Sequence, residues 1–393
     1  MSITSLLNGK TTKDFKFKEI VNSILPDESK FKTLSGKKAF SEELTLKVPN
    51  KLTNPFDSAI VGIAFDYLAR FRVAQKVKSH TNFEFVKANN FFWILLADNE
   101  THDKFKSRFN QGQDYVSKFV KSDNPIDKEL IHHAYYWARL EQYWRNRKIS
   151  THISSLLDPP SIEIENELFN LMKEFEKSFV SKVVKEDSDV LFNPEFGKCT
   201  IVTKGADADI HIDGVLYDFK TTKYNSYKKI DIQQIISYYL LYKINLRFYD
   251  DISDFFTEDK EIKPINKVAV YQARYGEINI LDMKFENSEL IEKAVDELLI
   301  LFKKPFMSKY AKLAEYGYHE IINEYYKDES ISLYKYIVDE YKLYYNNVIV
   351  TPNSKTYHTD INCFTLSRSY DYELITKEEA KERGILNKCK LCK

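Results

Sequence analysis

Residues 205–223, GADADIHIDGVLYDFKTTK, decide the fold of this 393-residue chain. Two runs of alternating residues flank the dipeptide Asp213-Gly214. Asp-Gly at the centre of a two-residue connection is among the strongest short-range signals for a β-hairpin. With these two residues as the loop, Ile212 pairs with Val215 and the pairing continues outward in register. The sequence therefore predicts two antiparallel strands joined by a tight turn.

The predicted register gathers acidic side chains on one face of the hairpin. It sets Asp209 opposite Asp218 and Asp207 opposite Lys220, and cross-strand partners share a face. Two facing carboxylates repel one another unless a cation lies between them, and divalent cations such as Mg²⁺ take oxygen ligands. We therefore expect Asp209 and Asp218 to bind Mg²⁺ (or Mn²⁺). If the strand register were shifted by two residues, Asp207 would take the ligand role. His211 lies on the same face, and it is either a further site residue or a surface histidine.

These groups match the needs of phosphodiester hydrolysis. A carboxylate pair holding Mg²⁺, with the Lys220 ammonium beside it, can bind a phosphodiester, polarise it and position an attacking water. A D-x-K triplet alone also occurs by chance in any charged protein. The next helix supplies a second feature, because Gln234 and Tyr238 stand one helical turn apart in DIQQIISYYLLY, residues 231–242.

Together these features resemble the PD-(D/E)xK nuclease superfamily, and in particular its RecB-like branch. The hairpin matches through Asp209 and the D-F-K of residues 218–220, and the K-T-T of residues 220–222 looks like the K-T element of that branch. Gln234 and Tyr238 reproduce its Q-x-x-x-Y element. The resemblance implies an α/β fold, with a restriction-endonuclease-like core of a mixed central sheet flanked by helices. It also implies catalytic roles for Asp209, Asp218, Lys220, Gln234 and Tyr238.

A helix that begins at Asn54-Pro55 carries a further candidate. Asn suits the N-cap and Pro the first helical position. Within this helix Gly62 and Asp66 stand one turn apart, which resembles the G-x-x-x-H element of many RecB-like nucleases with Asp in place of His. That departure leaves two interpretations. Asp66 is either a further catalytic residue that binds metal or water, or an exposed helical residue that pairs with Arg70.

The block at residues 76–185 is predicted to be helical, and RecB-like domains often carry a helical insertion at this place. Its centre is a stripe at helical spacing, which is usually core. The stripe comprises Tyr136, Trp137, Leu140, Tyr143 and Trp144. Arg139, Arg145 and Arg147 beside it keep open the alternative of a surface that stacks bases and binds phosphates.

The elements after the hairpin follow the order expected of the superfamily core. Residues 267–274 are predicted to form a strand, a second strand follows near residues 277–283, and residues 286–345 return to helix. Three glutamates near the end of the helical block fit the acidic first turn of a helix. They are Glu163, Glu165 and Glu167.

The C-terminal segment carries a second set of metal ligands. His358, Cys363, Cys389 and Cys392 form H-x4-C followed by C-x2-C. Thiolates and an imidazole at this spacing suit a closed tetrahedral Zn²⁺ site, whereas a redox C-x-x-C would need a thioredoxin-like context that is missing. The segment resembles small Ada-like zinc-binding modules. The remaining cysteine, Cys199, is predicted to be a core thiol.

The role of the zinc module stays open between two interpretations. It grips DNA through Lys388, Lys390 and Lys393, or it braces the nuclease domain or a partner protein. The predicted organisation is an N-terminal extension at residues 1–50, a nuclease domain at 51–345 and the zinc module at 346–393. Within the nuclease domain we expect the helical insertion at 76–185, the catalytic core at about 186–285 and C-terminal helices at 286–345.

Composition places further bounds on function. Lys and Arg together number 58, as do Asp and Glu, so the net charge is zero and any nucleic-acid surface must be local. Four cysteines and the lack of an N-terminal apolar segment argue against secretion, and no apolar run reaches membrane-spanning length. We expect a cytoplasmic protein without a membrane partner.

The sequence therefore predicts a Mg²⁺- or Mn²⁺-dependent nuclease that hydrolyses phosphodiester bonds, with DNA as the expected partner, in repair, recombination or defence against foreign DNA. One alternative is a catalytically silent or partner-activated subunit that binds nucleic acid with a nuclease-like fold. Another is a structural subunit that assembles through its zinc module. DNA or RNA, endo- or exonucleolytic cleavage, and a protein partner or homo-oligomer stay open at this point.

Overall fold

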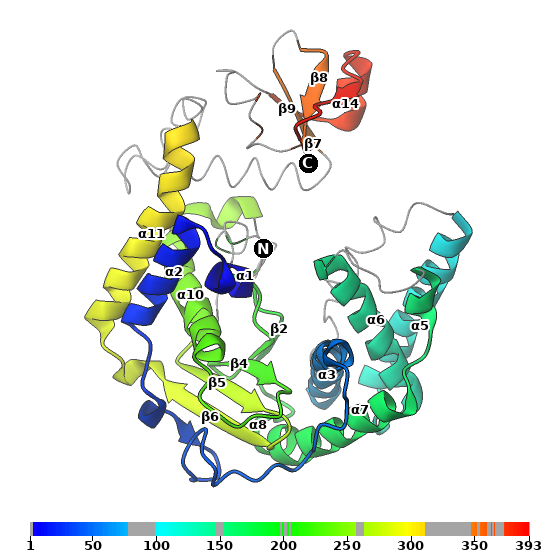
Figure 1. Ribbon diagram of the computed structural model, residues 1–393, viewed down its shortest axis with the longest axis vertical. Helices are drawn as coiled ribbons and strands as arrows, with labels where there is room; N and C mark the ends of the chain where they lie inside the picture. Colours follow the sequence, from blue (N-terminus) through cyan, green and yellow to red (C-terminus); the bar gives the residue numbers. More distant parts are fainter. Residues whose placement is uncertain are drawn as a thin grey trace.

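The computed structural model shows an α/β protein built on a mixed six-stranded sheet (Figure 1). The strand order is β1-β6-β5-β4-β3-β2, and a separate four-stranded sheet lies near the C-terminus. The structure describes residues 3–77, 99–146, 153–196, 206–256, 263–310, 347–351, 354–359 and 373–392, with residues 199, 203, 363 and 365.

One parallel strand pair sets the topology of the main sheet. Strands β4 and β5 are parallel, and the other neighbouring pairs are antiparallel. A parallel pair needs a crossover connection, and helix α10 (Lys229–Phe256) supplies it. The strands are β1 (Lys32–Thr33), β2 (Val190–Phe192), β3 (Ile210–Ile212), β4 (Val215–Lys220), β5 (Lys267–Gln272) and β6 (Glu277–Asp282).

The hairpin β3–β4 forms at Asp213-Gly214, as the sequence predicts. Ile212 pairs with Val215, and φ is +48° at Asp213 and +83° at Gly214, the left-handed values that a type I′ turn requires. The Asp213 carboxylate accepts hydrogen bonds from Ser188 Oγ at 2.9 Å and from Asp189 N at 2.8 Å. These bonds stabilise the turn against the preceding segment.

The hairpin diverges from the predicted register beyond Ile210. The β3–β4 ladder ends at Ile210 and Tyr217, so Asp209–Asp218 and Asp207–Lys220 are not ladder pairs. Asp207 instead forms an isolated bridge with Glu195. The Asp209 carboxylate, rather than a backbone carbonyl, accepts the hydrogen bond of Phe219 N at 2.5 Å. A side-chain acceptor thus replaces the next rung of the ladder.

Alternation along β4 divides its side chains between two cores. Tyr217 and Phe219 join the core that contains α3 and α7, whereas Leu216 joins the core that contains α10. Because alternate residues of a strand share a face, Asp218 and Lys220 leave the sheet on the side of Leu216. The two charged residues therefore face helix α10.

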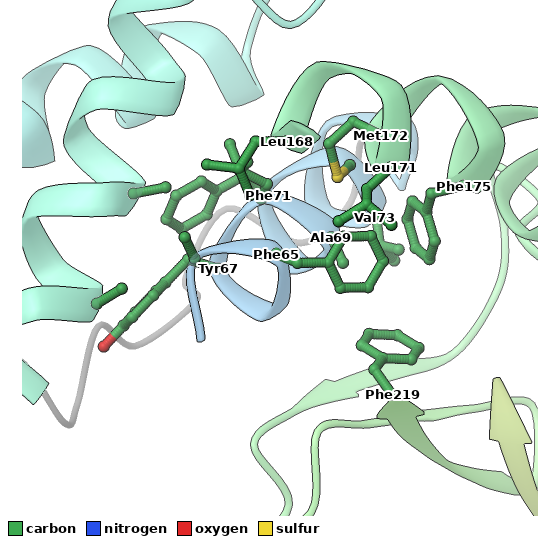
Figure 2. Close-up of a cluster of buried hydrophobic side chains, with 14 of the residues drawn as sticks. Phe65, Tyr67, Ala69, Phe71, Val73, Leu168, Leu171, Met172, Phe175 and Phe219 are labelled. Carbon is green, nitrogen blue, oxygen red and sulfur yellow. The ribbon is translucent and has the colours of Figure 1, made fainter. Parts of the chain in front are cut away.

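The helices of the predicted insertion cover one side of the sheet. They are α5 (Asn99–Val120), α6 (Lys128–Asn146), the 3₁₀ turn η3 (Ile153–Leu157), α7 (Ile162–Phe175), the π-helical turn η4 (Glu176–Val180) and α8 (Ser181–Val183), and helix α3 (Pro55–Lys76), which precedes the insertion, packs with them. Asn54 caps α3, as predicted, by accepting a hydrogen bond from Phe56 N. Figure 2 shows Phe65 of α3 beside Phe175 and Phe219, with ring centroids 5.5 and 6.0 Å away.

The aromatic stripe of α6 is core. Trp137 is fully buried, and Tyr136 and Leu140 are buried with it. Arg139 donates to the backbone carbonyl of Ser155, so it helps to hold the turn η3. The side chains of Trp144 and Arg145, and all of Arg147 and residues 78–98, lie outside the described part of the chain.

A second helical group covers the other side of the sheet (Figure 1). It comprises α1 (Ile3–Asn8), α2 (Thr12–Ser23), α10 and α11 (Ser288–Tyr310). Strand β1 pairs with β6 at the sheet edge, and short 3₁₀ turns η1 (Glu28–Lys30) and η5 (Met283–Phe285) flank these elements. Residues 3–50, which the sequence suggested as an extension, thus contribute helices and an edge strand to the main body.

The C-terminal sheet has its own small core. It contains β7 (Asn347–Val350), β8 (Thr356–His358), β9 (Glu373–Thr376) and β10 (Asn387–Lys388), with helix α14 (Lys377–Glu382) beside them. Thr376 caps α14 by accepting a hydrogen bond from Glu379 N at 3.1 Å. The buried hydrophobic cluster of this core comprises Val348, Val350, Ile375 and Ala380. Among the helices that the structure describes, none is both long and apolar enough to cross a membrane.

Candidate functional site

A pocket of about 540 Å³ lies at the C-terminal end of β4. The N-terminal half of α3 and the segment that precedes it line one wall, and residues 219–224 line the other. Gly62 permits a close approach between the walls, because a Cβ atom there would lie 3.2 Å from Thr221 Oγ1. Asp66 and Lys220 both line this pocket. The structure therefore joins the two sequence segments that carry the candidate residues.

Lys220 makes the central contacts of the site. Its Nζ atom lies 2.5 Å from Asp218 Oδ2 and donates to Gln234 Oε1 at 3.0 Å. Gln234 Nε2 in turn donates to Tyr238 OH at 2.9 Å. Tyr238 is buried, and its ring stacks on that of Phe196. The four residues predicted on β4 and the following helix thus form one connected chain of polar contacts.

Burial and neighbouring charges shift the pKa values of Asp218 and Lys220. Burial raises the pKa of Asp218 to about 7, with Lys220 opposing the shift and Asp209 adding to it. Burial lowers the pKa of Lys220, but Asp218, Asp231 and Asp209 outweigh it, so the Lys220 pKa lies above its ordinary value. Lys220 therefore stays cationic at neutral pH, whereas the pKa of Asp218 lies close to neutral pH.

Asp66 belongs to the same electrostatic group. Burial and then the Asp209 charge raise the pKa of Asp66 well above its ordinary value, whereas Arg70 and Lys220 lower it. Its side chain is half-buried and lines the pocket, and Arg70 is buried. Asp66 is therefore not the exposed helical residue of the second interpretation, although the Arg70 charge does act on it.

Asp207 and His211 lie apart from this group in different ways. The charges of Asp209 and Asp231 act on both Asp218 and Lys220, whereas Asp207 forms a bridge with Glu195. His211 Nε2 donates to the Pro264 carbonyl at 3.1 Å, near the turn end of the hairpin. Burial lowers the His211 pKa, and the charges that act on it come from other residues. The structure thus brings Asp209, and not His211, to Asp218.

The sequence analysis did not predict a buried ion pair that holds the backbone at one wall of the pocket. Arg274 Nε donates to the Thr221 carbonyl at 2.5 Å, and its guanidinium pairs with Glu167. Arg274 is 1% exposed and Glu167 is 4% exposed. Glu167 therefore does more than complete an acidic helical turn. An arginine at the end of an apolar strand does suggest a buried charge that needs a partner. That partner could not be identified from the sequence, because it lies 107 residues away in the chain.

Mutual repulsion of like charges, rather than a convergence of ligand atoms, characterises the acidic group around Asp218. Asp66, Asp209 and Asp218 act on one another electrostatically, and the pKa values of Asp66 and Asp218 are raised. A bound cation would relieve this repulsion. Among the described residues, however, the ligand atoms that lie close enough together to hold an ion belong to the C-terminal cluster.

The C-terminal cluster is the one predicted from the sequence. One ligand atom from each of His358, Cys363, Cys389 and Cys392 lies within 4.8 Å of the others, and all four residues are buried. Cys363 Sγ is 3.7 Å from Cys389 Sγ, and Cys392 Sγ is 3.5 Å from His358 Nδ1. Tetrahedral Zn²⁺ with its usual bond lengths gives edges of about 3.8 Å for S···S and about 3.6 Å for N···S. The cluster can therefore hold Zn²⁺.

Local contacts prepare the cysteines for a metal. The Thr365 hydroxyl lies 3.3 Å from Cys389 Sγ and, as the largest cause, lowers the Cys389 pKa to about 7. Metal binding uses the thiolate, so this shift favours a ligand. Cys389 N donates to the Tyr357 carbonyl at 2.8 Å, which holds the C-x2-C turn against β8. All four cysteines of the chain are thiols outside any disulfide, and Cys199 is buried in the main core as predicted.

No protein-family model matches the chain, and neither the curated proteins nor the solved structures give a match.

Proposed function

We propose that this protein is a metal-dependent nuclease of the PD-(D/E)xK, RecB-like kind, which hydrolyses phosphodiester bonds of DNA in repair, recombination or defence. The observation that carries the proposal is the convergence on Lys220. Asp218 and Gln234 contact its ammonium, the Asp209 charge acts on it, and Asp66 lines the same pocket. These residues come from helix α3, the hairpin and helix α10, far apart in the sequence.

The arrangement fits the charge demands of phosphodiester hydrolysis. Asp66, Asp209 and Asp218 would hold Mg²⁺ or Mn²⁺, which supplies charge neutralisation and Lewis-acid polarisation when bound. Lys220 remains protonated because of its acidic neighbours, so it can bind a phosphate oxygen and stabilise the charge that develops there. Gln234 orients Lys220, and Tyr238 orients Gln234. Each of these two is a positioning residue.

Cleavage assays on four DNA forms test the proposal. Closed circles and linear molecules, each single- and double-stranded, are incubated with Mg²⁺ or Mn²⁺. Lys220→Ala and Asp218→Asn should each lower the cleavage rate by about 100-fold or more, because they remove charge stabilisation in the transition state. Cleavage of a closed circle would establish endonuclease activity. Equal rates for wild type and both variants would refute the proposed site.

One control variant and one pair of ligand variants sharpen the assay. Lys267→Ala removes an exposed lysine at the start of β5, next to β4 but outside the pocket, and should cut like wild type. Asp209→Asn and Asp207→Asn compare the two candidate ligands. Because the Asp209 charge acts on Asp218, Asp209→Asn should lose more activity. A larger loss at Asp207 would transfer the ligand role to that residue.

One observation favours the partner-activated alternative. Asp218 is already paired with Lys220, and Asp209 already accepts the Phe219 N–H, so both carboxylates are engaged by protein donors. A partner that opened these contacts would free both carboxylates for a cation. This alternative predicts that the purified chain binds nucleic acid without cutting it, in both Mg²⁺ and Mn²⁺.

A further inference from the structure

An exposed aromatic ring lines the β4 pocket and has two lysines beside it. Tyr224 is 57% exposed and lines the pocket. The Nζ atoms of Lys223 and Lys228 each lie 5.2 Å from the centroid of its ring. An exposed large aromatic side chain with two cations beside it provides a stacking surface and phosphate ligands in one place.

Hydrogen bonds hold the backbone around Tyr224 in the segment that directly follows β4. Thr222 Oγ1 accepts hydrogen bonds from Lys228 Nζ at 2.8 Å and from Tyr224 N at 3.4 Å. Tyr275 OH donates to the Lys223 carbonyl at 2.7 Å. The ring therefore stands on an anchored turn only four residues after Lys220. A nucleotide on this ring would lie next to a phosphate at Lys220.

The opposite wall suits a base rather than a duplex. Its lining side chains alternate between apolar and hydrogen-bonding types: Asn50, Leu52, Thr53, Pro55, Ser58 and Ala59. The volume of about 540 Å³ lies in the range of small-ligand pockets. A space of that size admits one or two nucleotides and excludes a double helix.

We propose that this pocket takes an unpaired nucleotide beside the phosphate to be cut, with its base stacked on Tyr224 and its phosphate held by Lys223 and Lys228. Lys223 is exposed, so its ammonium can leave the ring for a phosphate and free one ring face. The substrate class is then a single strand, or a duplex whose end or interior is unpaired. This inference rests on the proposed nuclease function for the meaning of the adjacent phosphate, but nucleotide binding itself can be measured separately.

Binding without cleavage tests the pocket. Fluorescence anisotropy at fixed salt, without added divalent metal, measures the Kd for labelled dT20, rU20 and a fully paired, blunt-ended DNA duplex. Tyr224→Ala should weaken binding of a single strand at least about fivefold, the effect of losing one stacked base. Tyr224→Phe keeps the ring and should bind within about twofold of wild type. The rU20 and dT20 arms distinguish RNA from DNA as the source of the unpaired nucleotide.

Phe15→Ala is the matched control, since it removes an exposed ring, on α2, that does not line the pocket. It should leave every Kd unchanged. Wild-type affinity of Tyr224→Ala for both single strands would overturn the inference. An equal loss of single-strand and duplex binding would also overturn it, because Tyr224 would then serve as a general nucleic-acid contact.

The two proposals fail in different ways. If no metal supports cleavage but Tyr224→Ala still loses single-strand affinity, the nuclease proposal fails and the nucleotide pocket stands. If Lys220→Ala abolishes cleavage while Tyr224→Ala binds and cuts like wild type, the nuclease proposal stands and the nucleotide pocket is refuted.

Discussion

The two candidate metal centres differ in how far the protein alone assembles them. At the C-terminus the atoms of one histidine and three cysteines lie within 4.8 Å of one another, at spacings close to a tetrahedron's edges. At the β4 pocket, Asp218 pairs with Lys220 and Asp209 accepts a backbone N–H. The ligand atoms of the first site are spaced as a tetrahedral ion would require, whereas the carboxylates of the second site are held by the Lys220 ammonium and a backbone N–H.

The difference follows from the charge of the ligands. Neutral imidazole and protonated thiols can pack together without an ion, and the metal then displaces protons from the thiols. Buried carboxylates repel one another, so the protein must compensate their charge, and here Lys220 does so. A cation that entered the acidic group would have to compete with that lysine. Loss of metal binding at the C-terminal cluster should therefore mainly affect folding of the C-terminal sheet. Changes in the acidic group should mainly affect the cleavage rate.

Removal of the zinc ligands should have the largest effect on structure. Structural Zn²⁺ contributes an apparent binding free energy of about 10–16 kcal/mol in small modules, and this energy is coupled to folding. The double variant Cys389→Ser, Cys392→Ser should lose zinc in elemental analysis and become sensitive to protease after about residue 347. The main body has its own core and should melt as before.

Cys199→Ser is the matched control for this variant, since it changes a buried cysteine outside the cluster and should keep one zinc per chain. Wild-type protein without zinc would contradict the assignment. The double variant also separates the two roles of the module. Lost DNA affinity with unchanged melting of the main body favours a nucleic-acid grip, whereas a lower melting temperature of the main body favours a brace.

Breaking the ion pair below the pocket should cost the next largest amount. Glu167→Ala leaves the Arg274 guanidinium buried without its carboxylate, and loss of one partner of such a pair costs about 3–5 kcal/mol. Urea unfolding measures the change. The double variant Glu167→Ala, Arg274→Met should recover part of it, and Glu163→Ala, an exposed residue of the same helix, should change little. A near-zero change for Glu167→Ala would show that water reaches the pair.

The titration of Asp218 gives a smaller and pH-dependent effect. Its pKa is raised to about 7 in the folded protein from an ordinary value of 3.8, so the native state holds a proton that the unfolded chain releases. The free energy of unfolding should therefore fall as pH rises from about 4 to 7, by at most about 1.4 kcal/mol per pH unit. Asp218→Asn should lack this slope.

Unfolding without added divalent metal, at several pH values, tests that expectation. The difference between wild type and Asp218→Asn isolates the carboxyl, because both proteins carry the same zinc ligands. Asp187→Asn removes an exposed carboxylate that does not line the pocket and serves as the control. Parallel pH profiles for wild type and Asp218→Asn would contradict a raised pKa.

The parts of the fold that could be predicted depend on patterns of residues close together in the sequence. The Asp213-Gly214 turn, the Asn54 cap and the zinc spacing each depend on residues close in sequence. The contact between Lys220 and Gln234 was also within reach, because strand alternation and helical periodicity fix both directions.

Long-range pairing was out of reach. The end of the β3–β4 ladder at Ile210 depends on the competing bridge between Asp207 and Glu195. The partner of Arg274 lies on helix α7, and only tertiary packing brings Glu167 to it. Each of these contacts joins separate elements, and no local pattern specifies them.

The smallest expected effect sharpens the contrast between activity and folding. Gln233 and Gln234 are adjacent on α10, yet they contact different partners. Gln234 Oε1 accepts from Lys220, whereas Gln233 Nε2 donates to Asn22 Oδ1 of α2 at 2.8 Å.

Gln234→Ala should lower the cleavage rate about tenfold while changing the free energy of unfolding by less than about 1 kcal/mol, because its side chain is half-buried and positions Lys220. Gln233→Ala should do the reverse, since it removes a part-buried hydrogen bond between two helices at a cost of about 1–3 kcal/mol. Cleavage kinetics and urea unfolding on both variants decide the matter. Equal losses of activity for the two glutamines would mean that α10 affects the site only through stability, and Gln234 would then have no positioning role.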